Sequence, residues 1–207
     1  MEQGTTAWLH ARAGKITASR IADVMAKTKA GWGASRKNYA AQLIAERLTG
    51  VPQESGFTNA AMQWGTETEP RARAMYEFTS GQMVTETGFV PHPTIDGSGA
   101  SPDGLVSTDG LLEIKCPNTA THLETLEGAP IADKYVKQMH WQMICCQRDW
   151  CDFVSFDPRL PDSLQMVVQH VPLDPELAEQ ITKDVSDFNT EIDERVAAII
   201  AKYEKEL

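Results

Sequence analysis

The chain has 207 residues, of which 42% are hydrophobic and 23% charged, so its composition is that of a folded globular protein rather than a disordered one. This length predicts one domain over residues 1–207, and no apolar run reaches the ~20 residues that a membrane-spanning helix needs. The first ten residues lack a basic cluster followed by an apolar stretch, so we expect no signal peptide and a cytoplasmic location.

The formal net charge of −10 is unusual for a protein that binds DNA, but the charge is unevenly distributed. Residues 1–40 hold seven basic and two acidic residues, whereas residues 174–207 hold four basic and ten acidic ones. One interpretation is that a basic N-terminal part binds phosphate while an acidic centre binds metal. The other is that the charge only keeps the protein soluble. Charge alone leaves both open.

The first part of the chain is predicted to be mostly helical. The expected elements, in chain order, are a helix over 16–26, an exposed loop over 27–34, a helix capped by Ser35 and ending at Gly50, a loop over 51–57, and a helix over 59–79 that is interrupted or kinked near Gly65 and Pro70.

The second part is predicted to contain the strands. The expected elements are a strand over 83–90, a turn over 95–99, a hairpin made by 104–107 and 111–116, helices over 120–126 and 131–146, strands over 153–156 and 165–171, and a long acidic amphipathic helix from Pro175 to about Tyr203. This order predicts an α/β domain in which helices flank a central mixed sheet.

The most informative stretch runs from Pro102-Asp103 to Glu113-Ile114-Lys115. Glu113 and Lys115 are two residues apart on a predicted strand, so their side chains point to the same face. The hairpin turn at Asp109-Gly110 should bring Asp103 back beside Glu113. Two carboxylates and one ammonium group are therefore predicted to meet at one point.

Such a site suits hydrolysis of a phosphodiester. Two carboxylates can hold a hard cation such as Mg²⁺, which lowers the pKa of a water molecule and neutralises developing negative charge. Lys115 can orient the water or stabilise that charge. Because the motif is short, an ordinary surface hairpin with a Glu/Lys pair remains the alternative at this point.

The chain as a whole resembles the lambda-type phage exonucleases, a viral recombinase family of the PD-(D/E)-x-K nuclease superfamily. The resemblance runs from Ala7-Trp8 to Asp157-Pro158-Arg159. The matching blocks between these ends are Gly14 to Ser19, Trp64-Gly65 with Glu69 five residues after Trp64, Phe78 to Gly81, Ser101 to Leu105, and Glu113 to Pro117. The resemblance implies a restriction-endonuclease-like core.

The resemblance also implies roles for single residues. Asp103, Glu113 and the backbone carbonyl of Ile114 would hold the first Mg²⁺ of a two-metal site, in which Mn²⁺ could substitute. Asp103 would bridge to the second metal, and Glu69 would complete the acidic cluster. Lys115 would position the attacking water, and Gln138 would be a polar active-site residue. Without the resemblance, Glu69 and Gln138 would be ordinary helical residues.

Further residues would bind the DNA end. Arg12 and Ser19 fall at the positions that hold the 5′ phosphate in the family. Lys29 falls at a further basic position, as a point charge rather than a forked guanidinium. Met62 falls at the position of an apolar wedge that separates the strands, although helix packing would explain it equally well.

The four cysteines allow two interpretations. Some related nucleases hold an iron–sulfur cluster with one upstream and three downstream cysteines, an arrangement that Cys116, Cys145, Cys146 and Cys151 could copy. The favoured interpretation is that all four are reduced and mostly buried thiols.

The expected function is a Mg²⁺-dependent exonuclease that degrades one strand of linear duplex DNA from its 5′ end, releases 5′ mononucleotides and leaves a 3′ single strand for recombination. The resemblance implies a homotrimeric ring, a single-strand annealing protein as partner, and the cytoplasm of a bacterial host. The alternatives are an endonuclease on the same core and a catalytically silent module that binds DNA ends.

Overall fold

The computed structural model describes residues 2–29, 31–53 and 59–203. A five-stranded mixed sheet lies at its centre, with the strands in the order β10-β9-β8-β7-β4. These strands are β4 (Val84–Thr85), β7 (Gly104–Val106), β8 (Gly110–Lys115), β9 (Trp150–Phe156) and β10 (Met166–Pro172). Strands β8 and β9 are parallel, and the other neighbours are antiparallel.

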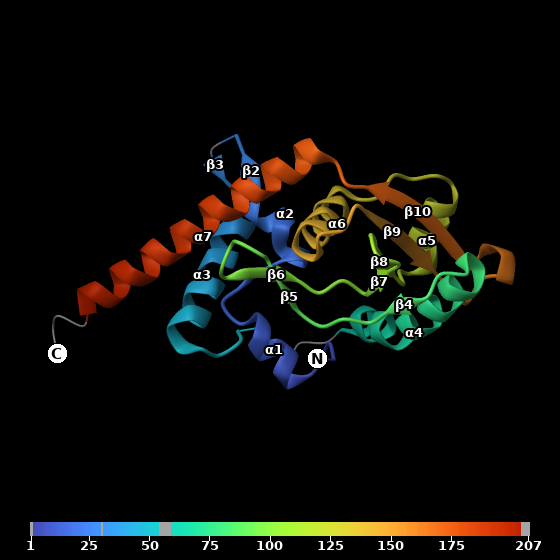
Figure 1. Cartoon of the computed structure of the whole chain (residues 1–207), viewed down its shortest axis with the longest axis horizontal. Coiled ribbons are helices and arrows are strands. Elements are labelled where there is room, and N and C mark those ends of the chain that lie inside the picture. Colours follow the sequence, from blue (N-terminus) through green and yellow to red (C-terminus); the bar gives the residue numbers. More distant parts are fainter. Residues whose placement is uncertain (1, 30, 54–58, 204–207) are drawn as a thin grey trace.

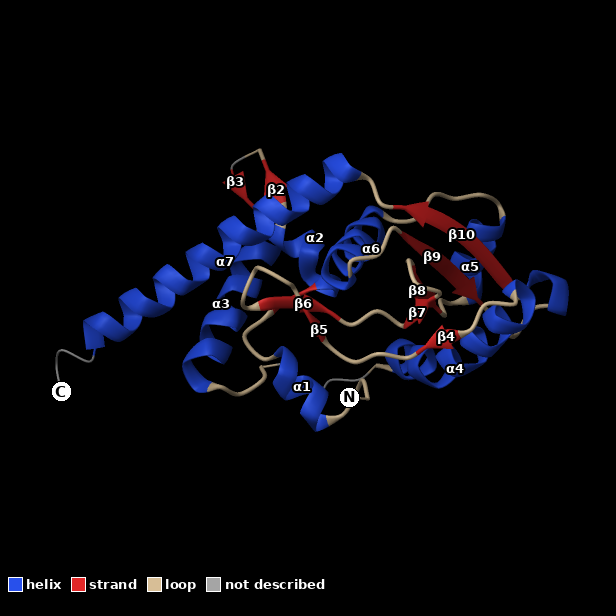
Figure 2. Ribbon diagram, viewed as in Figure 1, coloured by secondary structure: helices blue, strands red, loops and turns tan. Residues whose placement is uncertain are grey.

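Helices α4 (Ala60–Ser80) and α6 (Asp133–Cys146) pack on opposite faces of this sheet (Figure 2). Leu112 of β8 packs with Tyr76 of α4, whereas its neighbour Leu111 packs with Met139 and Met143 of α6. Successive strand residues point to opposite faces, so the apolar pattern of β8 serves both helices. The predicted α/β class, a mixed sheet flanked by helices, is confirmed.

A second layer adjoins the sheet through α6. It contains a three-stranded sheet in the order β1-β6-β5 and the helices α2, α3 and α7. The bounds are β1 (Ile16–Thr17), β5 (Val90–Pro91), β6 (Ser98–Ala100), α2 (Ile21–Val24), α3 (Ala34–Thr49) and α7 (Pro175–Tyr203). Helix α7 packs on α2 and α3, and its C-terminal end extends beyond the rest of the ribbon (Figure 1).

The remaining elements are short. They are α1 (Thr6–Arg12), the 3₁₀ turns η1 (Ala18–Arg20) and η2 (Asp162–Leu164), the hairpin of β2 (Lys27–Thr28) and β3 (Gly31–Trp32), and α5 (Thr119–Leu126). Among residues 2–29, 31–53 and 59–203, no helix has the length and apolar character needed to cross a membrane.

Most predicted helices are confirmed, with small shifts at their ends. Helix α3 ends at Gly50, which takes the left-handed conformation at φ 68°, as the glycine predicted. Its N-cap is Gly33 and Ser35 lies inside the helix, so the predicted Ser35 cap was wrong. Helix α4 is capped by Asn59 and continues through Gly65 and Pro70, so the expected interruption there is not found. Proline removes one backbone donor, and Ala72 and Tyr76 of the following turns pack on the sheet.

Several other predictions of local structure were wrong. The segment 16–26 begins with a strand because Ile16 and Thr17 pair with Ser98 and Gly99 of β6, which lies in the expected turn. The loop over 27–34 contains the β2–β3 hairpin, and the single strand over 83–90 is two short strands in different sheets. Helix α1 was not anticipated. The predicted loop over 51–57 lies partly outside the described residues.

Candidate active site

The hairpin of β7 and β8 places Asp103 beside the middle of β8. Gly104 pairs with Leu112, so Asp103 lies just past the end of the ladder, where its Oδ2 accepts a hydrogen bond from the Ile114 backbone N–H at 2.7 Å. A strand residue directs its N–H and C=O to the same side, so the Ile114 carbonyl points toward the edge that Asp103 occupies. A side chain at Gly104 would collide with Val84 of β4.

Glu113 and Lys115 lie on the face of β8 that is covered by α6. The Glu113 side chain has no exposed surface and forms an ion pair with the Lys115 ammonium, whose side chain is 29% exposed. The Lys115 Nζ also lies 5.0 Å from the ring centre of Tyr135. The predicted convergence of Asp103, Glu113 and Lys115 is what the fold produces.

Two amides of α6 hold the Glu113 carboxylate. Gln138 Nε2 donates to Oε1 and Gln142 Nε2 donates to Oε2, both at 2.7 Å. The two glutamines are four residues apart and so occupy the same face of the helix. Glu113 is thereby fixed in orientation, and the predicted position of Gln138 in the site is supported by direct contact.

Burial and like charges shape the electrostatics of the site. Burial, together with the nearby charge of Glu113, raises the pKa of Asp103 well above its ordinary range. Burial opposes the charge of Lys115, but Glu113 and Asp103 outweigh it, so the net effect is a raised pKa and a protonated ammonium group. The site thus combines excess negative charge with one fixed cation.

One cavity of about 170 Å³ connects these groups with the N-terminal part of the chain. Its lining includes six of the predicted site residues, namely Arg12, Ser19, Asp103, Glu113, Lys115 and Gln138. Arg12 comes from the last turn of α1 and Ser19 from η1. The other four are Asp103, Glu113 and Lys115 of the β7–β8 hairpin and Gln138 of α6. Residues from distant parts of the sequence therefore face one space.

Glu69 lies close to the acidic groups but does not line this cavity. Its Oε1 forms a 2.6 Å ion pair with Arg73 Nη2, which also donates to the Asp103 carbonyl at 3.3 Å. Burial raises the pKa of Glu69, Arg73 counteracts this, and Glu113 adds to it. Arg73 therefore connects Glu69 to the Asp103 backbone.

Lys29 and Met62 lie outside the cavity lining. Lys29 is exposed, at the turn between β2 and β3, and Met62 is 54% exposed in the first turn of α4. The structure leaves both side chains accessible to a large ligand, and their DNA-binding roles stay predictions.

Two N-terminal residues that were not predicted as site residues, Trp8 and Gln3, support the site. Trp8 Nε1 donates to Ser101 Oγ at 3.0 Å, and the Arg12 guanidinium carbon lies 3.8 Å from the centre of the Trp8 ring. Gln3 donates to the Pro102 carbonyl at 2.9 Å. The spacing of Trp8 and Arg12, one helical turn apart, was a usable signal.

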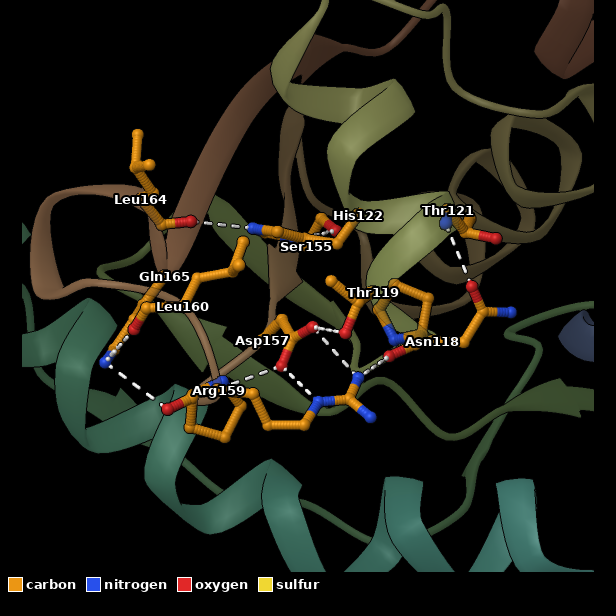
Figure 3. A network of polar contacts seen from close by, with 12 residues as sticks. Asn118, Thr119, Thr121, His122, Ser155, Asp157, Arg159, Leu160, Leu164 and Gln165 are labelled. Atoms are coloured by element: carbon orange, nitrogen blue, oxygen red, sulfur yellow. Dashed lines mark hydrogen bonds and ion pairs between the residues drawn. The ribbon is translucent and has the colours of Figure 1, made fainter.

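A polar network lies where β8 and β9 end and α5 begins (Figure 3). Asp157 is fully buried and accepts hydrogen bonds from Arg159 Nε at 2.6 Å, Arg159 Nη2 at 2.9 Å and Thr119 Oγ1 at 2.7 Å. Arg159 also donates to the Pro117 carbonyl at 3.2 Å and lies 4.6 Å from the ring centre of Trp64. This network joins the ends of β8 and β9 to α5 and α4.

The donor set at the cavity fits a hard cation. Carboxylate oxygens of Asp103 and Glu113 and the Ile114 carbonyl are ligands that Mg²⁺ accepts. Across the described part of the chain, no three His, Cys, Asp or Glu side chains converge as metal ligands. Glu69, the third predicted carboxylate, forms an ion pair with Arg73. A cation held by two carboxylates and one carbonyl would offset the negative charge that raises the pKa of Asp103.

The cysteines do not share a site in the structure. Cys145, Cys116 and Cys151 pack in three different apolar clusters, and Cys146 packs near Cys151. All four are free thiols, and burial raises the pKa of Cys116 to about 12. This placement favours packing over iron–sulfur binding.

Comparisons with known proteins find similar exonucleases. The chain is 50% identical to an alkaline exonuclease from Laribacter hongkongensis, with 98% of this chain and 100% of that chain covered and a TM-score of 0.90. The same exonuclease in complex with dAMP matches with a TM-score of 0.91. A phage-related exonuclease from Haemophilus somnus 129PT shares the fold, with 17% identity, 89% and 96% coverage and a TM-score of 0.67.

A search of the curated proteins finds no significant match. The family described as the YqaJ-like viral recombinase domain matches residues 7–149, which include Arg12, Ser19, Asp103, Glu113 and Lys115. With this match and the 50% identity above, the resemblance to viral recombinase exonucleases that the motifs indicated is confirmed. The chain belongs to the family of YqaJ-like viral recombinase domains.

Proposed function

We propose that the chain is a Mg²⁺-dependent exodeoxyribonuclease that degrades one strand of linear duplex DNA from its 5′ end. The observation that carries this proposal is that one cavity is lined both by Asp103, Glu113 and Lys115 and by Arg12 and Ser19. The three residues that would cleave the phosphodiester and the two that would bind the 5′ phosphate would then contact the same DNA end. The 50% identical alkaline exonuclease supports the activity.

Each side chain has a definite task in this proposal. Asp103 and Glu113, with the Ile114 carbonyl, would hold Mg²⁺, which supplies charge neutralisation and a lowered pKa of water. Lys115, kept protonated by its two acidic neighbours, would stabilise the extra negative charge on the phosphate. Gln138 and Gln142 keep Glu113 fixed, so little reorganisation is needed during the reaction.

The direction of digestion would follow from the other end of the cavity. The Arg12 guanidinium can donate parallel hydrogen bonds to a 5′ phosphate, and the exposed Ser19 can add a hydroxyl donor. Each cut leaves a new 5′ phosphate on the remaining strand, which this pair would then bind. Repeated cycles release 5′ mononucleotides and leave a 3′ single strand. The complex of the Laribacter exonuclease with dAMP, a nucleoside monophosphate, agrees with such a product.

The proposed assembly is a homotrimer. A closed ring of three chains would let basic N-terminal segments line a channel while acidic α7 helices face outward. The family, described as viral recombinase, supports a role in recombination. In that role, the partner would be a single-strand annealing protein. Co-elution of the chain with such a protein would support this role, and separate elution at working concentrations would contradict it.

Digestion of a linear duplex labelled at one 5′ end tests the direction. With Mg²⁺ present, the label should appear first as a mononucleotide, and a label at the 3′ end of the same strand should be released last. Release of both labels at equal early rates would contradict 5′ to 3′ digestion. The Lys115→Ala variant serves as the control for contaminating nucleases.

A further inference from the structure

Gln142 is a buried polar residue that the proposed reaction does not need for contact with DNA. Its side chain has no exposed surface, and it lies behind the cavity rather than in its lining. Its Nε2 donates to Glu113 Oε2 at 2.7 Å. Among the described residues, its Oε1 has no hydrogen-bond partner. An unpaired buried amide oxygen is unfavourable, so an apolar residue would suit packing alone better.

The two oxygens of Glu113 have different surroundings. Oε1 contacts Gln138 and Lys115, and both of these residues line the cavity. Oε2 contacts Gln142, which does not. Helix α6 contacts both oxygens, through Gln138 and Gln142, but only the partners of Oε1 line the cavity, so Oε1 is the oxygen on the cavity side.

We propose that Gln142 is a positioning residue. By donating to Oε2 of Glu113, it keeps that oxygen from binding a metal ion and thereby favours Mg²⁺ over Ca²⁺ at the site. This inference rests on the proposed metal site. Mg²⁺ needs few, well-placed ligands at short distance, whereas Ca²⁺ takes six to eight oxygens and often both oxygens of one carboxylate. A carboxylate that offers only one oxygen suits the smaller ion. Partners of metal ligands commonly tune affinity in this way.

The test is calorimetric titration of the full chain, without DNA, with Mg²⁺ and separately with Ca²⁺. Gln142→Met removes the amide at similar volume, and Gln142→Asn keeps an amide that is too short to reach Oε2. Gln165→Met is the matched control, because Gln165 is also a buried glutamine but bonds to Leu160 and Asp162, in the η2 region. Urea unfolding of each variant reports its folding.

Both Gln142 variants should bind Mg²⁺ about 10-fold more weakly, the lower end of the range for such partners. Ca²⁺ affinity should fall less, so the ratio of the two dissociation constants moves toward Ca²⁺. The Gln165 control should keep the original ratio. An unchanged ratio, or equal losses for both ions, would overturn the role in selection. If the unmodified chain binds no Mg²⁺, the metal site itself is overturned, and the role of Gln142 with it.

Discussion

Replacing Asp157 by asparagine removes one negative charge from the network behind the active site. Burial alone would raise the pKa of Asp157, but hydrogen bonds from Arg159 and Thr119 outweigh it and lower the pKa to about 2. Lowering an aspartate pKa from its ordinary ~3.9 to about 2 corresponds to about 2.6 kcal/mol in favour of the charged, folded form. Because the Arg159 side chain is 46% exposed, solvent screens the pair, and we expect about 1–2 kcal/mol.

The pH dependence has a definite sign. A carboxyl group whose pKa is lowered by folding contributes its full stabilisation above about pH 4 and loses it as the pH falls toward 2. Asp157→Asn should therefore be less stable than the original chain at pH 7, and this difference should shrink between pH 4 and pH 2. The exposed Asp96→Asn is the matched control and should change stability little at either pH.

Urea unfolding followed by tryptophan fluorescence measures both variants. The midpoint should fall for Asp157→Asn at pH 7 without a change in the slope of free energy against urea concentration. Equal stability of Asp157→Asn and the original chain at pH 7 would refute the stabilising role of the network. A loss that persists undiminished below pH 3 would refute its electrostatic origin.

Three further predictions concern the reaction, and a fourth concerns the assembly. Asp103→Asn and Lys115→Ala should abolish cutting while gel-shift assays still show binding to DNA ends; near-normal turnover by Lys115→Ala would remove the lysine from the mechanism. Ca²⁺ alone should bind without supporting digestion, since its looser geometry aligns the reacting groups poorly, and rapid digestion in Ca²⁺ would contradict this. Arg12→Ala should slow digestion of 5′-phosphorylated ends by about 10- to 100-fold, because hydrogen bonds to charged groups contribute about 1.5–3 kcal/mol. Digestion of 5′-hydroxyl ends should slow much less. Equal losses on both kinds of end would mean that Arg12 attracts DNA only diffusely. Light scattering should give the mass of three chains, and a fully active monomer would exclude the ring.

The central acidic site could be predicted from the sequence because its geometry is local. A tight turn fixes the register of β7 against β8, and strand alternation then sets Glu113 and Lys115 on one face. Asp103 is only eleven positions away from Ile114, whose backbone N–H it contacts. Gln138 and Arg12 needed the family resemblance, because nothing local tells a site residue from an exposed one.

Other features depend on contacts that are distant in sequence. Strand β1 exists because Ile16 and Thr17 pair with residues more than eighty positions away, and a two-residue strand has no periodicity to read. The contact of Trp8 with Ser101 depends on how α1 is placed against the sheet. The orientation of Glu69 toward Arg73 is different, since their spacing of four on one helix was available in the sequence.

Digestion of linear and covalently closed circular forms of the same plasmid in Mg²⁺ tests the central claim most directly. The proposed exonuclease needs an end for Arg12 and Ser19, so the linear form should be converted to mononucleotides and a single strand while the closed circle stays intact. Cleavage of closed circles would identify an endonuclease instead. If neither form is cut while linear DNA is still bound, the chain is a silent end-binding module.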